Sequence, residues 1–220
     1  MANGKGSGST ENGAYNLVAA PAGTAPAKNF INPYTGAAPT FYIPNENEWY
    51  KAAYYSPDYG GARVGGYYAY ATQSNTDPGN VVGSDANQAN YHNGVFSVTQ
   101  SVIHDSSQNY LTDVGAFTNS ASFYGTFDQT GNVFQWNDLD GTAGSSRGLR
   151  GGTWGSDDPF IMSSSFSLPH DPLYGSAGFG FRLASPVATG VPEIDPNGLS
   201  AVLGLIVGGL GLLERRRYGR

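Results

Sequence analysis

The stretches LRGGTW at residues 149–154 and GFGFRL at residues 178–183 decide what fold this sequence can form. Both combine apolar or aromatic residues with glycines, and both are expected to be β-strands. Glycine inside a strand lets a second backbone approach closely. A third stretch, GNVFQW at residues 131–136, precedes them and starts with a Gly-Asn pair that suits a turn. The sequence therefore predicts two strands near its C-terminal end, in a chain with many turns.

The composition around these strands is that of a loop-rich globular domain. Glycine and proline, 32 and 13 residues, make up about a fifth of the 220-residue chain. Aromatic residues account for 13%, which excludes a disordered polar tail, because disordered chains contain few aromatics. Glycine and asparagine are weak helix formers, which argues against a helical bundle. We expect an aromatic core surrounded by turns.

Cysteine content and charge exclude several functions. The chain contains no cysteine, so it has no disulfide, no thiolate metal site and no cysteine nucleophile. Its net charge is −6, and four of its 11 basic residues lie within the last six positions. An acidic body repels polyanions, so no nucleic-acid partner is expected. Carboxylate pairs at Asp157 and Asp158 and at Asp138 and Asp140 would suit glycoside hydrolysis, but neighbouring aspartates in loops are more often solvated or capping residues.

Residues 45–55 are expected to form a short helix. Asn45 and Glu48 have the spacing of a capping box, in which each side chain accepts a hydrogen bond from the other residue's backbone. Apolar residues then follow on one face, and Pro57 ends the helix. Residues 60–125 read as short irregular strands and long loops.

We expect the chain to consist of five parts. The first part is rich in Gly, Pro and Ala, and the last part is basic. The expected layout is a loop region at 1–40, the main domain at 41–185, a linker at 186–197, a transmembrane helix at 198–213 and a basic tail at 214–220.

The apolar segment 198–213 indicates a membrane anchor. It carries no charged side chain and would extend about 24 Å as a helix, not far short of a membrane span. Arg215, Arg216 and Arg217 follow, and arginines beside an apolar segment mark the cytoplasmic end of a membrane helix. The body of the protein is then expected outside the cytoplasm. Residues 1–13 do not have the pattern of a signal peptide.

Val191, Pro192 and Glu193, followed by the apolar segment and the arginines, resemble the PEP-CTERM sorting signal. In that family the next residue is usually proline, whereas this chain has Ile194. The resemblance implies export to the cell envelope or extracellular surface, with membrane anchoring before any cleavage. It also implies a sorting protease of the exosortase type as a partner, in a bacterium.

Four stretches, in order, resemble the formylglycine-generating enzyme family, also called sulfatase-modifying factors. They are YIPNENEWYKAA at 42–53, ANY at 89–91, GNVFQW at 131–136, and LRGGTW at 149–154 paired with GFR at 180–182. Together they cover about residues 40–184. The resemblance implies an irregular, loop-rich α+β domain of the C-type-lectin-like fold. It also implies that about a third of the domain precedes Met1, so we expect this chain to be the C-terminal portion of a longer product.

Active members of that family use two cysteines, five residues apart, to bind copper and oxidise a substrate cysteine. The resemblance places these two positions at Asp157 and Met162. Soft thiolates bind Cu(I), whereas oxygen and nitrogen ligands bind it poorly. Copper is therefore not expected here, and neither is the oxidase activity. Two arginine positions of the same family segment are occupied by Ser163 and Ser167.

The resemblance also implies structural calcium at two places, because family members hold Ca²⁺ through asparagine, carboxylate and carbonyl oxygens. The first set is Asn90, the Tyr91 carbonyl, and Asp105 or Ser106. The second set is Asn132, the Val133 carbonyl and Gln135, where glutamine in place of glutamate removes a charge.

These observations favour an exported, surface-sorted protein. Its domain is degenerate, because it lacks the family's copper-binding cysteines, and acts as a binding or structural module. Its ligand would be a polysaccharide or another surface protein. Tyrosines of residues 54–70 suit a contact surface if they are exposed, although ordinary core packing is the alternative. Two other functions stay open: a sulfatase-modifying oxidase or other enzyme on the same scaffold, and a truncated gene product.

Overall fold

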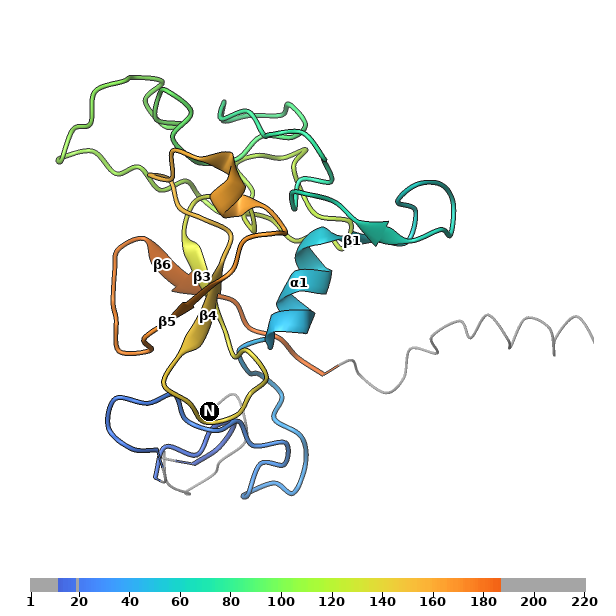
Figure 1. The fold of residues 1–220 in the computed structure, drawn as a ribbon, viewed down its shortest axis with the longest axis vertical. Coiled ribbons are helices and arrows are strands. Elements are labelled where there is room, and N and C mark those ends of the chain that lie inside the picture. Colours follow the sequence, from blue (N-terminus) through green and yellow to red (C-terminus); the bar gives the residue numbers. More distant parts are fainter. Residues whose placement is uncertain (1–11, 19, 187–220) are drawn as a thin grey trace, which may run out of the picture. The chain divides into compact units, whose positions relative to one another are not determined.

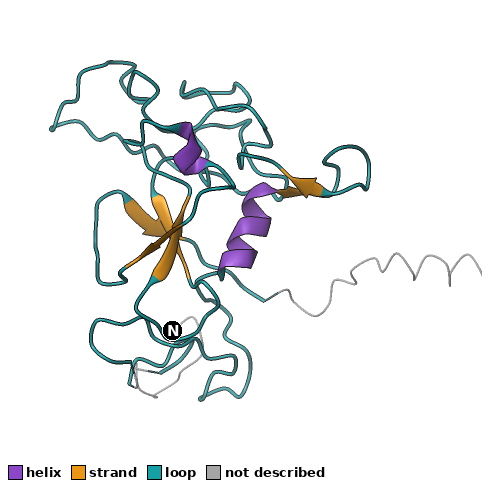
Figure 2. Ribbon diagram, in the orientation of Figure 1, coloured by secondary structure: helices purple, strands orange, loops and turns teal. Residues whose placement is uncertain are grey.

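A mixed sheet of four short strands lies in the middle of the domain, with long loops at both of its ends (Figures 1 and 2). The computed structural model describes residues 12–18 and 20–186. The strands are β3 (Phe134–Asn137), β4 (Arg147–Arg150), β5 (Leu168–His170) and β6 (Phe179–Phe181). Their order is β5-β4-β3-β6; β4 is antiparallel to β3 and β5, and β6 is parallel to β3. The strand expected at 178–183 is confirmed as β6.

The strand expected at 149–154 ends earlier, at Arg150. Gly151 and Gly152 have φ angles of 95° and 70°, in the left-handed region that glycine adopts without strain. A Cβ at Gly152 would lie 2.6 Å from the Met162 side chain, so the turn also needs the empty space. The glycines therefore end β4 and direct the chain into the next loop.

The expected helix is confirmed as α1 (Glu46–Tyr54). Its capping box is formed as predicted: the Glu48 backbone donates to Asn45 Oδ1 at 2.8 Å, and the Asn45 backbone donates to Glu48 Oε2 at 2.8 Å. Two short strands, β1 (Tyr55–Ser56) and β2 (Gly66–Tyr67), form an antiparallel pair just after it. A 3-10 helix, η1 (Pro159–Met162), follows the loop after β4.

The core is aromatic and joins α1 to the sheet. Trp49 of α1 is 1% exposed, and its Nε1 donates to Gln135 Oε1 of β3 at 3.0 Å. Tyr54 is equally buried and donates to the Met162 carbonyl at 3.2 Å. One buried apolar cluster gathers on α1, and a second surrounds Met162. The structure thus agrees with the α+β, loop-rich fold that the sequence predicts.

The tyrosines of residues 54–70 do not form one exposed surface. Tyr54 and Tyr70 are buried, at 1% and 5% exposure, whereas Tyr67 is 46% exposed. Of the two alternatives, core packing therefore holds for Tyr54 and Tyr70, and only the exposed tyrosines are available for a contact surface. Tyr54 belongs to the buried cluster that also contains Trp49 and Ala53 of α1.

Among residues 12–18 and 20–186, no helix is both long and apolar enough to cross a membrane. The expected linker, sorting motif, transmembrane helix and basic tail lie outside the described residues, apart from Pro186.

Candidate functional site

The loop after β4 and η1 carry the two positions that the resemblance assigns to the family's cysteines, and the structure places them in different surroundings. Asp157 is exposed, whereas Met162 is 0% exposed and packs against Tyr70, Ala89 and Tyr91. Between them, the Asp158 side chain caps η1 by accepting from the Phe160 backbone at 2.9 Å. One position therefore belongs to the surface and the other to the core.

Asn90 and Asn132, one from each expected calcium set, lie against each other. Asn90 Nδ2 donates to Asn132 Oδ1 at 3.1 Å and to the Tyr110 carbonyl at 2.8 Å. Asn132 Oδ1 also accepts from the Thr112 backbone at 3.1 Å, and the Asn132 backbone donates to the Asn90 carbonyl. This paired-amide contact joins the 90–112 loops to the start of the segment that forms β3.

The other expected calcium ligands lie elsewhere or are already engaged. The exposed Asp105 carboxylate accepts from Ser107, which lowers its pKa. Gln135 Oε1 accepts from Trp49 and Arg182 in the core. The Tyr91 carbonyl accepts from Asn80 at 3.2 Å. As arranged, these oxygens accept hydrogen bonds from N–H and O–H donors, and calcium stays a prediction from the resemblance.

A thermal melt in EDTA and then in excess Ca²⁺ tests that prediction. Asn90→Ala should cost about 1–3 kcal/mol in both conditions, because the buried Asn90 Nδ2 is lost and the Tyr110 carbonyl loses this donor. A site at Asn90 requires, in addition, a Ca²⁺-dependent rise of the wild-type midpoint that the variant lacks. Equal wild-type midpoints with and without Ca²⁺ would contradict the prediction.

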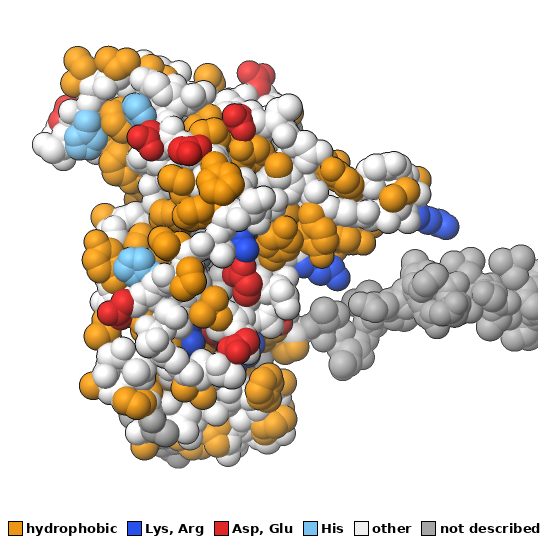
Figure 3. Space-filling model, viewed as in Figure 1, with side chains coloured by type: hydrophobic (Ala, Val, Ile, Leu, Met, Phe, Trp, Pro, Cys, Tyr) orange, Lys and Arg blue, Asp and Glu red, His pale blue; other side chains and the backbone are white. Residues whose placement is uncertain are grey.

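Beside the paired amides, three aromatic rings lie nearly parallel; we call His104, Tyr110 and Trp154 the aromatic platform. Their planes are within 18° of one another, and the centroid distances are 4.9 Å (Tyr110–Trp154), 5.2 Å (His104–Tyr110) and 5.9 Å (His104–Trp154). Tyr110 is buried, Trp154 is half-buried and His104 is exposed. Figure 3 shows histidine, hydrophobic and acidic side chains together at this end of the domain.

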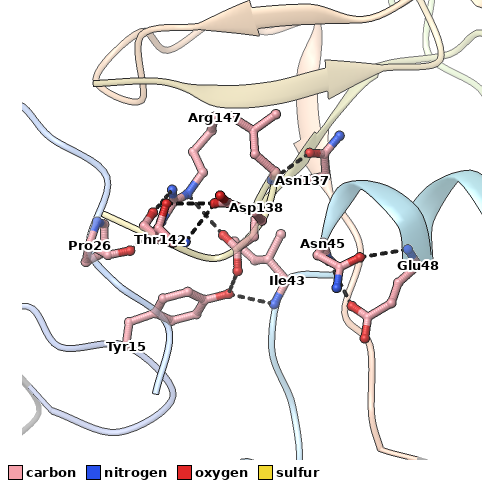
Figure 4. Close-up of polar contacts among 11 residues, drawn as sticks. Tyr15, Pro26, Ile43, Asn45, Glu48, Asn137, Asp138, Thr142 and Arg147 are labelled. Atoms are coloured by element: carbon pink, nitrogen blue, oxygen red, sulfur yellow. Dashed lines mark hydrogen bonds and ion pairs between the residues drawn. The ribbon is translucent and has the colours of Figure 1, made fainter. Parts of the chain in front are cut away.

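At the opposite end of the sheet from the aromatic platform, a buried ion pair lies beside a pocket. Arg147 Nε lies 3.0 Å from Asp138 Oδ1, and the Asp138 side chain is 0% exposed. Tyr15 donates to Asp138 Oδ2 at 2.5 Å and accepts from the Ile43 backbone at 3.0 Å (Figure 4). Burial raises the pKa of Asp138, although Tyr15 and Arg147 oppose that shift.

A pocket of about 260 Å³ opens beside this ion pair. Its walls are mostly apolar, and its polar atoms are largely engaged with one another. Arg147 donates to the Thr142 carbonyl at 3.0 Å and to the Pro26 carbonyl. The pocket is lined by Tyr15, Leu17, Ala25, Pro26, Ile43, Trp136, Asn137, Asp138, Arg147 and Pro172. These contacts attach the N-terminal loops to the β3–β4 hairpin, which is a structural role.

The buried tyrosines predict a loss of stability in alkali. Burial is the main cause that raises the pKa of Tyr15, Tyr54 and Tyr70 above the ordinary value of about 10. A raised folded-state pKa contributes stability that is complete below the unfolded-state pKa and is lost as pH rises above it. We expect the free energy of unfolding in guanidinium chloride to be lower at about pH 11 than at about pH 9. Tyr15→Phe should reduce that difference, and an unchanged difference would exclude Tyr15 as a contributor.

Sequence reasoning missed the platform and the ion pair. In the sequence, Trp154 stands out only as part of a family stretch, and no local pattern marks Tyr15 as a functional or buried residue. Tyr15 and Asp138 are 123 positions apart, so no local pattern connects them. Charged side chains are almost never fully buried unless they are paired. In a chain with so few charged residues, an arginine and an aspartate were therefore the one hint of a buried ion pair in the sequence.

A small mixed sheet, one capped helix and long ordered loops define an irregular α+β domain. The family profile of the sulfatase-modifying factor enzyme 1-like domain, FGE-sulfatase, matches residues 14–187. The chain belongs to this family. The match extends the recognised resemblance toward the N-terminus, over the loops that contain Tyr15.

Three solved structures are partly similar to this chain. The variable protein 1 of Treponema denticola is 24% identical, with a TM-score of 0.44, over 66% of this chain and 47% of that one. CarF is 20% identical, with a TM-score of 0.44, over 67% and 48%. PvdO from Pseudomonas aeruginosa is 18% identical, with a TM-score of 0.36, over 66% and 52%. The chain thus matches about half the length of these proteins. A search of curated proteins found no significant match.

Proposed function

We propose that this domain is a non-catalytic binding module of the sulfatase-modifying factor family, displayed on a bacterial cell surface. The proposal rests on the residues that occupy the family's two cysteine positions in this chain. Asp157 is a hard oxygen donor at the surface, and Met162 is packed in the core. Because the chain contains no cysteine, it cannot supply the paired thiolates that hold Cu(I).

The ligand-binding face that we propose is formed by the loops around the aromatic platform. These loops are held by the paired amides and by the Trp154 backbone, which donates to the Asn132 carbonyl at 2.9 Å. A preformed face loses little conformational entropy on binding, which suits a binding module. A polysaccharide or another surface protein is the expected class of ligand.

Surface display rests on the C-terminal residues, which lie outside the described part of the chain. Val191, Pro192 and Glu193 supply the sorting motif, and the apolar segment 198–213 with its arginines supplies the anchor. The proposed partner at that end is a sorting protease of the exosortase type. Trimming of the tail in a host that has such a protease would support this part, and an untrimmed chain in that host would oppose it.

An oxidation assay tests the module against the enzyme. The full chain is incubated with copper, oxygen and a cysteine-containing sulfatase peptide, and the peptide is analysed by mass spectrometry. We expect no formylglycine, while a family member that carries both cysteines converts the same peptide. Turnover by this chain would overturn the proposal. An Asp157→Ala variant is the control, because a residue without a catalytic role should leave the result unchanged.

A further inference from the structure

We propose that the aromatic platform is a stacking site for the sugar rings of an uncharged polysaccharide. This inference rests on the proposed function and specifies its ligand. It follows from the geometry of His104, Tyr110 and Trp154, from the way these rings are held, and from the charge of the surrounding loops.

The ring geometry suits a flat ligand. All three centroid distances are below 6 Å, so the rings form a triangle rather than a column, in which the outer pair would be much farther apart. Tyr110 is 4% exposed, whereas His104 is exposed and Trp154 is half-buried. The more exposed pair therefore lies against a buried third ring. The negative faces of aromatic rings attract C–H groups, which a pyranose ring presents on its flat side.

The platform is held in place before any ligand binds. Tyr110 Oη accepts from the Asp105 backbone at 2.8 Å, and the Tyr110 carbonyl accepts from Asn90 Nδ2 at 2.8 Å. Phe96 packs against all three rings, at 4.6 Å from Tyr110, 5.6 Å from His104 and 6.0 Å from Trp154. Rigid aromatic side chains provide contact area at a low cost in conformational entropy.

The charge of the loops around the aromatic platform indicates which polysaccharides can bind there. No lysine or arginine occurs in residues 64–146 or in residues 151–181, the segments that form the platform and its surroundings. The exposed charged residues closest to the platform rings in sequence are all acidic: Asp105, Asp113 and Asp157. On the visible face of this end of the domain, Figure 3 shows acidic side chains and no basic ones. Uronate, sulfate or phosphate groups would be repelled here, whereas carboxylates accept hydrogen bonds from neutral sugar hydroxyls.

Titration calorimetry of the full 220-residue chain tests the inference with four probes. Three are neutral hexasaccharides, namely cellohexaose, maltohexaose and mannohexaose, and the fourth is the anionic hexagalacturonate. We expect saturable binding of at least one neutral probe and binding of the anionic probe that is weaker by at least about tenfold. Trp154→Ala and His104→Ala should each weaken the neutral interaction by about tenfold or more, as expected for aromatic residues central to a binding site.

Matched variants separate binding from folding. Tyr124 is an exposed aromatic residue outside the platform, at 48% exposure, and Tyr124→Ala should bind as the wild type does. Trp154→Phe keeps a ring and should bind better than Trp154→Ala. His104→Ala changes an exposed ring, so its melting midpoint should stay close to that of the wild type.

Three results would overturn the inference: no binding of any neutral probe, anionic binding as tight as the neutral one, or full binding by both platform variants. These failures differ from failure of the proposed function. Formylglycine formation in the oxidation assay would overturn the proposal that the domain is a non-catalytic binding module. Absence of both sugar binding and oxidation would leave the module standing, with a protein as its ligand.

Discussion

Arg147→Met is expected to destabilise the domain by about 3–5 kcal/mol at neutral pH, because it leaves Asp138 buried without its countercharge. Asp138 is 0% exposed and lies 3.0 Å from Arg147 Nε. The variant also removes the donors to the Thr142 and Pro26 carbonyls. Guanidinium chloride unfolding, followed by circular dichroism, measures the change.

The pH dependence of this variant identifies the cause. Without Arg147, the folded-state pKa of Asp138 should rise further above the unfolded-state value of about 3.9. A raised folded-state pKa contributes stability below the unfolded-state pKa and loses it as pH rises. The deficit of Arg147→Met should therefore be large at pH 7 and smaller near pH 4. A deficit that stays constant with pH would mean that lost packing, not charge, is responsible.

Two controls accompany the measurement. Arg63 is exposed and far from any buried carboxylate in sequence, so Arg63→Met should change stability by no more than about 0.5 kcal/mol. The double variant Asp138→Leu with Arg147→Met removes both charges and should recover much of the loss, as replaced buried ion pairs often do. A double variant as unstable as the sum of the single variants would contradict the ion-pair explanation.

Trp49→Ala is expected to cost about 3–5 kcal/mol, because it removes the largest buried side chain between α1 and the sheet. Trp49 is 1% exposed and packs edge-on against Tyr54, at a centroid distance of 5.8 Å. Such a loss is a large part of the 5–15 kcal/mol total of a typical domain. We expect a much lower midpoint in denaturant and a weaker near-ultraviolet circular dichroism signal.

Trp49→Phe separates packing from hydrogen bonding. It keeps an aromatic ring but loses the donor to Gln135, whose Oε1 still accepts from Arg182 Nε at 2.6 Å. The expected cost is therefore smaller, about 1–2 kcal/mol. Tyr67→Ala, at a half-exposed aromatic position, should cost less than either variant. If Trp49→Ala cost no more than Tyr67→Ala, the assignment of Trp49 to the core would fail.

Local signals in the sequence predicted the parts of the fold that depend on neighbouring residues. The capping box of Asn45 and Glu48 is three positions wide, and it forms as expected. The family stretches likewise indicated an α+β domain, which the profile match over residues 14–187 supports. The resemblance in the sequence assigned the family's cysteine positions to Asp157 and Met162, but it did not show that Asp157 is exposed and Met162 buried.

By itself, the sequence determined the class of the domain, its helix, the β6 strand and the absence of thiol chemistry. Only the tertiary structure decided where β4 ends, which tyrosines are buried, and which distant side chains meet. The platform brings together His104, Tyr110 and Trp154, and the ion pair brings Tyr15 to Asp138, 123 positions away. The physical reason is that caps and turns depend on contacts within a few residues, whereas burial and long-range pairing depend on how the whole chain packs.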